Sequence, residues 1–195
     1  MAHAHDLSDP TDLAGLRRYL KAEDAAGKLA SLDMLDLQIS GDAHLHVAAA
    51  VGDALAQVGK SGRAAIVILV DKSAIKRQGH SLRALVEGQL QDAHTVRTAV
   101  LDDGHRTLHA DDKVLDAATR EVKGADLVVT IGSGTMTDIG KVATNRNANI
   151  PQVAVQTAAS VDGFTDNVSV ILRNGVKRTI PSRWPTVVLA DATTI

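Results

Sequence analysis

The stretch Asp126-Leu-Val-Val-Thr-Ile131 runs directly into Gly132-Ser-Gly-Thr-Met-Thr-Asp-Ile-Gly-Lys141. Its first six residues form an apolar, β-branched run, which is typical of a strand buried on both faces of a parallel sheet. Residues 136–144 indicate a helix. Glycines between a strand and a helix let a ligand approach the backbone, and the free N–H groups of a helix start favour an anion. We therefore predict a diphosphate site at this junction, with a tight turn that binds nothing as the alternative.

The spacing of this junction differs from two common nucleotide-binding motifs. Its glycines fall at positions 132, 134 and 140, which is not G-x-G-x-x-G spacing, and no Gly-Lys-Ser/Thr follows them. Asp71 ends an earlier apolar run and so lies upstream of the glycines. The acidic residue of a Rossmann fingerprint lies ~20 residues downstream of them. The junction is therefore neither a Rossmann fingerprint nor a Walker A loop.

Strand and helix patterns alternate on both sides of the junction. Strands are expected at residues 34–39, 64–70, 95–101, 126–131, 153–155 and 187–190, and helices at residues 44–58, 75–90, 112–122 and 136–144. This order predicts an α/β fold, a doubly wound, mostly parallel sheet with helices on both faces. Asn174-Gly175 between two β-rich runs predicts a β-hairpin insertion. Residues 1–33 are expected to be a helical lead-in or arm, and residues 34–195 the nucleotide-binding domain.

Composition excludes several classes of function. The 195 residues are 45% hydrophobic and 23% charged, which is ordinary for a globular protein. The net charge of −2 and the three aromatic residues argue against nucleic-acid binding. Without cysteine, the chain has no disulfide, no thiolate zinc site and no Cys nucleophile. No apolar run approaches the ~20 residues of a membrane span and no signal peptide is evident, so a cytoplasmic location is expected.

Two histidine pairs have spacings that can bind metal. His44 and His46 are two residues apart, and His105 and His109 are four apart. No carboxylate accompanies either pair at a recognisable spacing, because Asp102-Asp103 is read as loop. Both pairs are therefore interpreted as solvated or capping histidines, and no metal ligand is predicted.

Two groups of basic residues are weighed in the same way. Lys76-Arg77 and His80 are expected on the solvated face of the helix at residues 75–90, with contact to a nucleotide as the alternative. Lys177 and Arg178 follow the hairpin turn, where a cation for a substrate phosphate is one interpretation and an ordinary exposed pair is the other.

Two sequence blocks in order carry a family resemblance. The first is Gly132-Ser-Gly-Thr-Met-Thr-Asp138-Ile-Gly-Lys141, and the second is Thr157-Ala-Ala-Ser160-Val-Asp162-Gly163-Phe-Thr. Together they resemble the glycerol-1-phosphate dehydrogenase branch of the superfamily that includes iron-containing alcohol dehydrogenases, glycerol dehydrogenase and 3-dehydroquinate synthase. The hairpin and the strand that ends at Asp191 are also similar, so the resemblance covers roughly residues 35–195.

The resemblance implies roles for individual residues, although it assigns no catalytic residue within this chain. Asp162 would contact the polyol substrate. Asp71 would bond the adenosine ribose, and its charge would repel a 2′-phosphate, which favours NAD while leaving NADP possible. Asp166 falls where the family often has a nucleotide-contacting Ser. The residues implied in cofactor binding are Asp71, Gly132, Ser133, Gly134, Thr135, Met136, Thr157, Ala158, Ala159 and Ser160.

The resemblance also implies an activity. The chain would belong to an NAD(P)-dependent oxidoreductase of phospholipid metabolism that transfers hydride between dihydroxyacetone phosphate and glycerol-1-phosphate. Its substrate would be a small polyol or polyol phosphate. A homodimer is a further expectation. A divalent metal, zinc or iron, would be bound by one acidic residue and two histidines in a helical domain that is absent from this chain, so a truncated, N-terminal nucleotide-binding half is expected. A lyase of the 3-dehydroquinate synthase kind and a catalytically inactive nucleotide-binding module stay open as alternatives.

Overall fold

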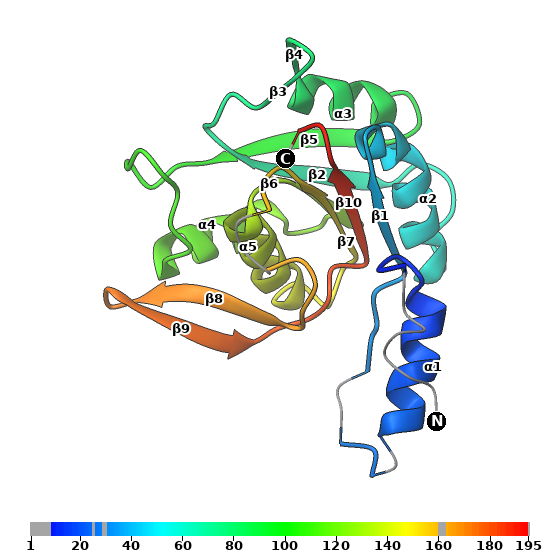
Figure 1. Cartoon of the computed structure of the whole chain (residues 1–195). Coiled ribbons are helices and arrows are strands. Elements are labelled where there is room, and N and C mark those ends of the chain that lie inside the picture. Colours follow the sequence, from blue (N-terminus) through cyan, green and yellow to red (C-terminus); the bar gives the residue numbers. More distant parts are fainter. Residues whose placement is uncertain (1–8, 25, 29–30, 160–162, 195) are drawn as a thin grey trace.

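The centre of the molecule is a six-stranded parallel sheet (Figure 1). The computed structural model describes residues 9–24, 26–28, 31–159 and 163–194. The strand order is β1-β10-β7-β6-β2-β5. These strands are β1 (Asp36–Ser40), β2 (Ala65–Asp71), β5 (Thr95–Leu101), β6 (Leu127–Gly132), β7 (Gln152–Gln156) and β10 (Val187–Asp191). The interior strands β6, β7 and β10 are buried along their whole length, as their continuous apolar sequences predict.

Helices cover both faces of the sheet, as the sequence predicted. Alternate residues of β2 and β6 point to opposite faces and build two cores. On one face pack α2 (Val47–Gln57) and α3 (Leu82–Leu90), and on the other pack α4 (Asp112–Glu121) and α5 (Gly134–Asn145). The helix α1 (Leu13–Glu23) joins a third, smaller core around Met34 and Val188. Within the described ranges, no helix is long and apolar enough to cross a lipid bilayer.

A hairpin packs beside α5, and it confirms the prediction made from Asn174-Gly175 (Figure 1). Its strands are β8 (Val168–Arg173) and β9 (Val176–Pro181). Asn174 and Gly175 have φ angles of +52° and +74°, the left-handed pair that a two-residue type I′ turn requires. The backbone N–H of Leu172 donates to the carbonyl of Ala110 at 2.9 Å, which ties the hairpin to the start of α4.

The single helix predicted over residues 75–90 is wrong. The segment begins with two short strands, β3 (Lys76–Arg77) and β4 (His80–Ser81), and the helix α3 begins only at Leu82. The cause is the turn between the strands, where Gln78 and Gly79 have φ angles of +50° and +82° that no helix contains. As a consequence, Arg77 is not on a solvated helix face but is 7% exposed.

The topology fixes where a ligand can bind. The chain leaves β2 towards β5 on one side, returns to β6 on the other side of β2, and then proceeds away to β7. The order of strands therefore reverses between β2 and β6. In open parallel sheets, ligands bind outside the carboxyl ends of the strands at such a switch point. Asp71 ends β2 and Gly132 ends β6, so both lie at this position.

Candidate nucleotide-binding site

A cavity of about 370 Å³ opens at the carboxyl ends of β2, β5 and β6. Val70, Val100 and Ile131 from the three strands line it, together with Asp71 and the residues that follow. The carboxylate of Asp71 is partly exposed and accepts a hydrogen bond from the backbone N–H of Ser73 at 2.8 Å. The cavity thus combines apolar strand ends with the fixed carboxylate of Asp71 and the cations of Lys72 and Arg83. The carboxylate suits the hydroxyls of a ribose.

The junction between β6 and α5 presents free backbone donors at the same edge. The helix begins at Gly134, and Ser133 is its N-cap with extended backbone angles (φ −77°, ψ −177°). Among the described residues, the side chain of Ser133 makes no capping hydrogen bond. The first bond back to the cap is from Thr137 N–H to Ser133 O, at 3.2 Å. The N–H groups of residues 134–136 are therefore left for an anion, and the positive end of the helix dipole adds to its attraction.

Steric constraint explains the first glycine of the junction. A Cβ at Gly132 would lie 2.5 Å from Cγ and 2.8 Å from Cβ of Met136. The side chain of Met136 is fully buried in the core under the loop. Of the residues implied in cofactor binding, Met136 can therefore meet a nucleotide only through its backbone.

The second implied block lies next to the first. The N–H of Thr157 donates to the carbonyl of Gly132 at 3.0 Å, so the ends of β6 and β7 are joined. Thr157 and Ala158 are partly exposed and Ala159 is exposed. Ser160 and Asp162 lie outside the described residues. Gly163 is the next described residue. A Cβ at Gly163 would lie 3.0 Å from the carbonyl oxygen of Gly134, so the two blocks approach closely.

A buried ionic cluster under the junction was missed by the sequence analysis. Lys141 is completely buried, with its Nζ 2.9 Å from Asp138 Oδ1 and 2.7 Å from Asp166 Oδ1, and it also donates to the carbonyl of Val168. Asp138 Oδ2 accepts the N–H of Val170 at 3.1 Å. Burial raises the pKa of Asp138, and the neighbouring ammonium of Lys141 opposes that effect. The cluster fastens α5 to β8, and the i, i+3 spacing of Asp138 and Lys141 is the signal that could have revealed it.

A second cluster surrounds Asp191 at the end of β10. His44 Nδ1 contacts Asp191 Oδ2, and Arg77 Nε lies 3.3 Å from the same oxygen. Thr193 Oγ1 donates to Asp191 Oδ1 at 2.6 Å. Burial by itself would raise the pKa of Asp191, but the hydrogen bonds from Thr193, His44 and Arg77 outweigh it and hold the pKa well below its usual range. His44 is therefore a buried structural partner, not the solvated histidine that was predicted.

The Asp191 cluster predicts a loss of stability in acid. Because the pKa of Asp191 is lower in the folded chain than its unfolded value of about 3.9, its ionised form stabilises the fold above about pH 4, and this contribution fades as the pH falls toward 2. We expect Asp191→Asn to lower the free energy of unfolding at pH 7 by about 2 kcal/mol or more. In urea unfolding, the free energy of unfolding of the variant should also decline less steeply between about pH 4 and pH 2. The exposed Asp116, paired with Arg146 at 3.0 Å, gives the control Asp116→Asn, which should follow the unchanged chain; an unchanged slope for Asp191→Asn would contradict the assignment.

The family model for iron-containing alcohol dehydrogenases matches residues 45–195. This chain belongs to that family. The strand–glycine–helix junction, the second block and the hairpin all lie within the matched region. The resemblance stated from the two sequence blocks is thereby confirmed at the level of the family.

Curated relatives place the chain near one branch of the iron-containing alcohol dehydrogenase family. A glycerol-1-phosphate dehydrogenase from Halalkalibacterium halodurans, named as using NAD(P)+, is 30% identical over 128 residues, which are 65% of this chain and 31% of the relative. The enzyme of the same name from Methanosarcina mazei is 29% identical over 141 residues, which are 72% of this chain and 37% of the relative. The chain therefore spans about a third of the length of these relatives.

Solved structures share the fold. An iron-containing alcohol dehydrogenase from Thermococcus thioreducens superimposes with a TM-score of 0.65 at 14% identity, over 85% of this chain and 47% of that chain. A sulfoacetaldehyde reductase from Bifidobacterium kashiwanohense, solved in complex with NAD+, superimposes with a TM-score of 0.60 at 18% identity, over 84% of this chain and 46% of that chain. At these identities the likeness establishes the α/β architecture alone.

The metal that the resemblance implies does not fit the histidine pair His44 and His46. That metal would need one acidic residue and two histidines. His44 is buried and bound to Asp191, while His46 is exposed at the start of α2. These residues do not supply the required set, so we derive no step through a metal at this site.

Proposed function

We propose that this chain is the NAD(P)-binding half of an oxidoreductase that interconverts dihydroxyacetone phosphate and glycerol-1-phosphate. The observation that carries the proposal is the uncapped start of α5 at the switch point, beside a cavity that holds the carboxylate of Asp71. The relatives reported above carry the name glycerol-1-phosphate dehydrogenase, which favours this activity over the lyase alternative.

Each part of the site has a distinct task in the proposal. The N–H groups of residues 134–136 would hold the diphosphate, and Asp71 would accept hydrogen bonds from the adenosine ribose. Thr157, Ala158 and Ala159 would line the path of the dinucleotide, with Ser160 continuing it and Asp162 orienting the substrate. The bound nicotinamide supplies or accepts the hydride. Lys177 shares a cavity of about 260 Å³ with Thr135, which makes it our candidate for the substrate phosphate.

Asp71 should set the preference for NADH over NADPH. Its carboxylate and a 2′-phosphate are both negative, and two unit charges about 4 Å apart repel by roughly 1–4 kcal/mol between bulk water and a protein surface. We expect Asp71→Ser to shift the ratio of NADPH to NADH affinity towards NADPH by about tenfold or more. Fluorescence titration of the chain with each reduced cofactor measures this ratio.

The control for Asp71 is a neighbouring carboxylate that makes no part of the proposed site. Asp102 follows β5 and is paired with Lys72 at 2.9 Å. Asp102→Asn should leave the ratio of the two affinities unchanged. If Asp71→Ser leaves it unchanged as well, Asp71 does not face the ribose.

The whole proposal is tested by calorimetric titration of the chain with NADH, followed by a turnover assay with glycerol-1-phosphate and added zinc. Binding with turnover supports the full proposal. Binding without turnover supports the nucleotide-binding part of the proposal and leaves the inactive nucleotide-binding module as the alternative. Phosphate release from the seven-carbon substrate of 3-dehydroquinate synthase would favour the lyase. Absence of NADH and NADPH binding overturns all of these interpretations.

A further inference from the structure

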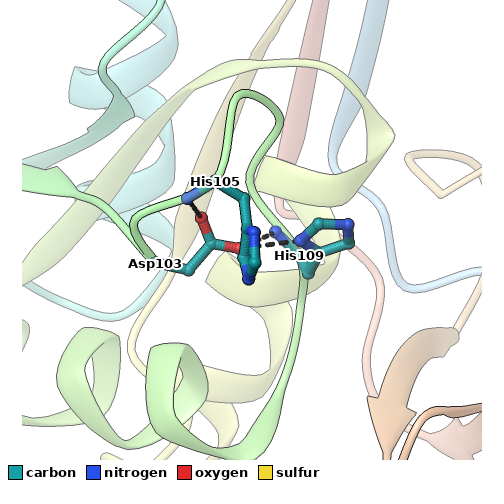
Figure 2. A group of neighbouring side chains, drawn as sticks. All are labelled: Asp103, His105 and His109. Atoms are coloured by element: carbon teal, nitrogen blue, oxygen red, sulfur yellow. Dashed lines mark hydrogen bonds and ion pairs between the residues drawn. The ribbon is translucent and has the colours of Figure 1, made fainter.

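The loop that follows β5 brings one carboxylate and two imidazoles together (Figure 2). β5 ends at Leu101, and α4 begins at Asp112 after its N-cap Asp111. Between them, Asp103, His105 and His109 place one potential ligand atom each within 4.8 Å of one another. The spacing of the two histidines predicted no metal ligand, because Asp102-Asp103 was interpreted as loop. The structure instead places its carboxylate beside both histidines.

The carboxylate of Asp103 is held firmly. Its Oδ1 accepts the backbone N–H of His105 at 3.0 Å, and its Oδ2 accepts the backbone N–H of His109 at 2.9 Å. The same Oδ2 lies 2.8 Å from Nδ1 of the His109 ring. The Asp103 side chain is only 5% exposed, whereas that of His109 is 46% exposed. A fixed, nearly buried carboxylate therefore faces two side chains that are free to adjust.

We propose that Asp103, His105 and His109 form a binding site for a divalent transition-metal ion, with Zn²⁺ as the preferred occupant. Two imidazole nitrogens and one carboxylate oxygen form a donor set that suits zinc. With metal–ligand bonds of ~2.1 Å, a tetrahedral site needs ligand atoms about 3.4 Å apart. The centroids of the two rings lie 5.3 Å apart, edge to face, and both residues are exposed. Small movements of the rings would therefore bring their nitrogens to the spacing that a tetrahedral site needs.

The binding step exchanges a proton for the metal. Zinc binds a neutral imidazole and an ionised carboxylate, so the ion would displace the proton shared by His109 Nδ1 and Asp103 Oδ2 into solvent. Three protein ligands leave the fourth position to water.

The surroundings favour a cation. A cavity of about 320 Å³ adjoins the cluster, and Asp102 and Asp111 line it together with Asp103 and His105. Lys113 also lines it, and Lys72 neutralises Asp102 at 2.9 Å. A bound ion would therefore meet a net negative wall. Through the Lys72–Asp102 pair, it would also fix the loop beside the carboxyl end of β2.

Equilibrium dialysis of the chain against zinc chloride tests the proposal, with metal content measured by mass spectrometry. We expect one zinc ion per chain from this site. His105→Gln together with His109→Gln should weaken zinc binding by about tenfold or more. Tenfold is the lower bound, because changes to residues that only support the ligands already weaken binding by this much. Co²⁺ in place of zinc should give the visible absorption of a tetrahedral site, and this absorption should be lost in the same double variant.

The control removes two other histidines. His3 and His5 lie outside the described residues, and they are two residues apart in the sequence, so they are the other histidine pair to test. His3→Gln with His5→Gln should retain the bound zinc and the Co²⁺ spectrum. The proposal is overturned if the bound zinc is lost in the variant without His3 and His5. It is also overturned if the variant without His105 and His109 binds zinc as tightly as the unchanged chain.

Thermal unfolding gives an independent reading. At a hundredfold excess of zinc over its dissociation constant, binding to the folded chain should raise Tm by roughly 5–10 °C. The single change His105→Gln guards against a folding defect, because that side chain is exposed. It should leave Tm without zinc unchanged and reduce the zinc-dependent rise by about half or more. A full rise in this variant would contradict the proposal.

Discussion

Replacing Ser133 with Asp is expected to abolish NADH binding while leaving the fold intact. Ser133 is the N-cap of α5, and Asp caps helices as well as Ser does, so the free energy of unfolding should not fall. The new carboxylate would accept hydrogen bonds from the N–H groups of residues 134–136, which are the groups that we propose for the diphosphate. It would also repel that diphosphate at short range, which weakens NADH binding by about a hundredfold or more. Fluorescence titration with NADH and urea unfolding measure the two effects separately.

The matched control for this change is Ser133→Asn. Asn has nearly the shape of Asp and caps helices equally well, but it carries no charge. It should bind NADH within a few-fold of the unchanged chain. Equal affinities for the Asp and Asn variants would show that the nucleotide does not place its diphosphate at the start of α5.

Truncating Lys141 is expected to cause the largest loss of stability. Its ammonium is fully buried between Asp138 and Asp166, so Lys141→Ala leaves Asp138 buried and unpaired. Removing one partner of a buried ion pair typically costs about 3–5 kcal/mol. For a domain of this size, that corresponds to a fall in Tm of roughly 10 °C. Urea and thermal unfolding measure both quantities.

Two further variants separate burial of charge from the loss of a long side chain. Arg146 is the C-cap of the same helix and pairs with Asp116 in solvent, so Arg146→Ala should cost no more than about 1 kcal/mol. Lys141→Met combined with Asp138→Asn removes both charges and keeps the volume, and it should recover most of the stability. Similar losses in Lys141→Ala and Arg146→Ala, or a double variant as unstable as Lys141→Ala, would contradict this account.

Local patterns were sufficient to predict much of the fold. The strand expected at residues 95–101 has those same bounds, and the Asn174-Gly175 turn closes the hairpin that it predicted. Apolar runs and two-residue turns are encoded by neighbours in the sequence, which explains this success. The helix predicted over residues 75–90 was wrong because Gln78 and Gly79 together reverse the chain, which the apolar periodicity did not reveal.

The charged clusters could not be predicted because their members are remote in sequence. Asp191 meets His44 across 147 positions and Arg77 across 114, and no periodicity connects them. Asp166, which falls where the family often has a nucleotide-contacting Ser, is paired with Lys141 across 25 positions. For the candidate site, the sequence identified the junction and Asp71. Only the strand order placed them at one switch point.

The pairing of β1 with β10 has a consequence for the order of events during synthesis. Residues 36–40 hydrogen-bond in parallel with residues 187–191, and about 150 residues separate the two strands. At a translation rate of ~5–20 residues per second, β1 waits on the order of 10–30 s for that partner. During this interval its backbone groups and the apolar side chains of Leu35 and Ile39, which stay exposed even in the finished fold, are open to other nascent chains. The pairing of β1 with β10 therefore completes the sheet late in synthesis. Until then, the unpaired β1 is the segment that a chaperone would need to cover.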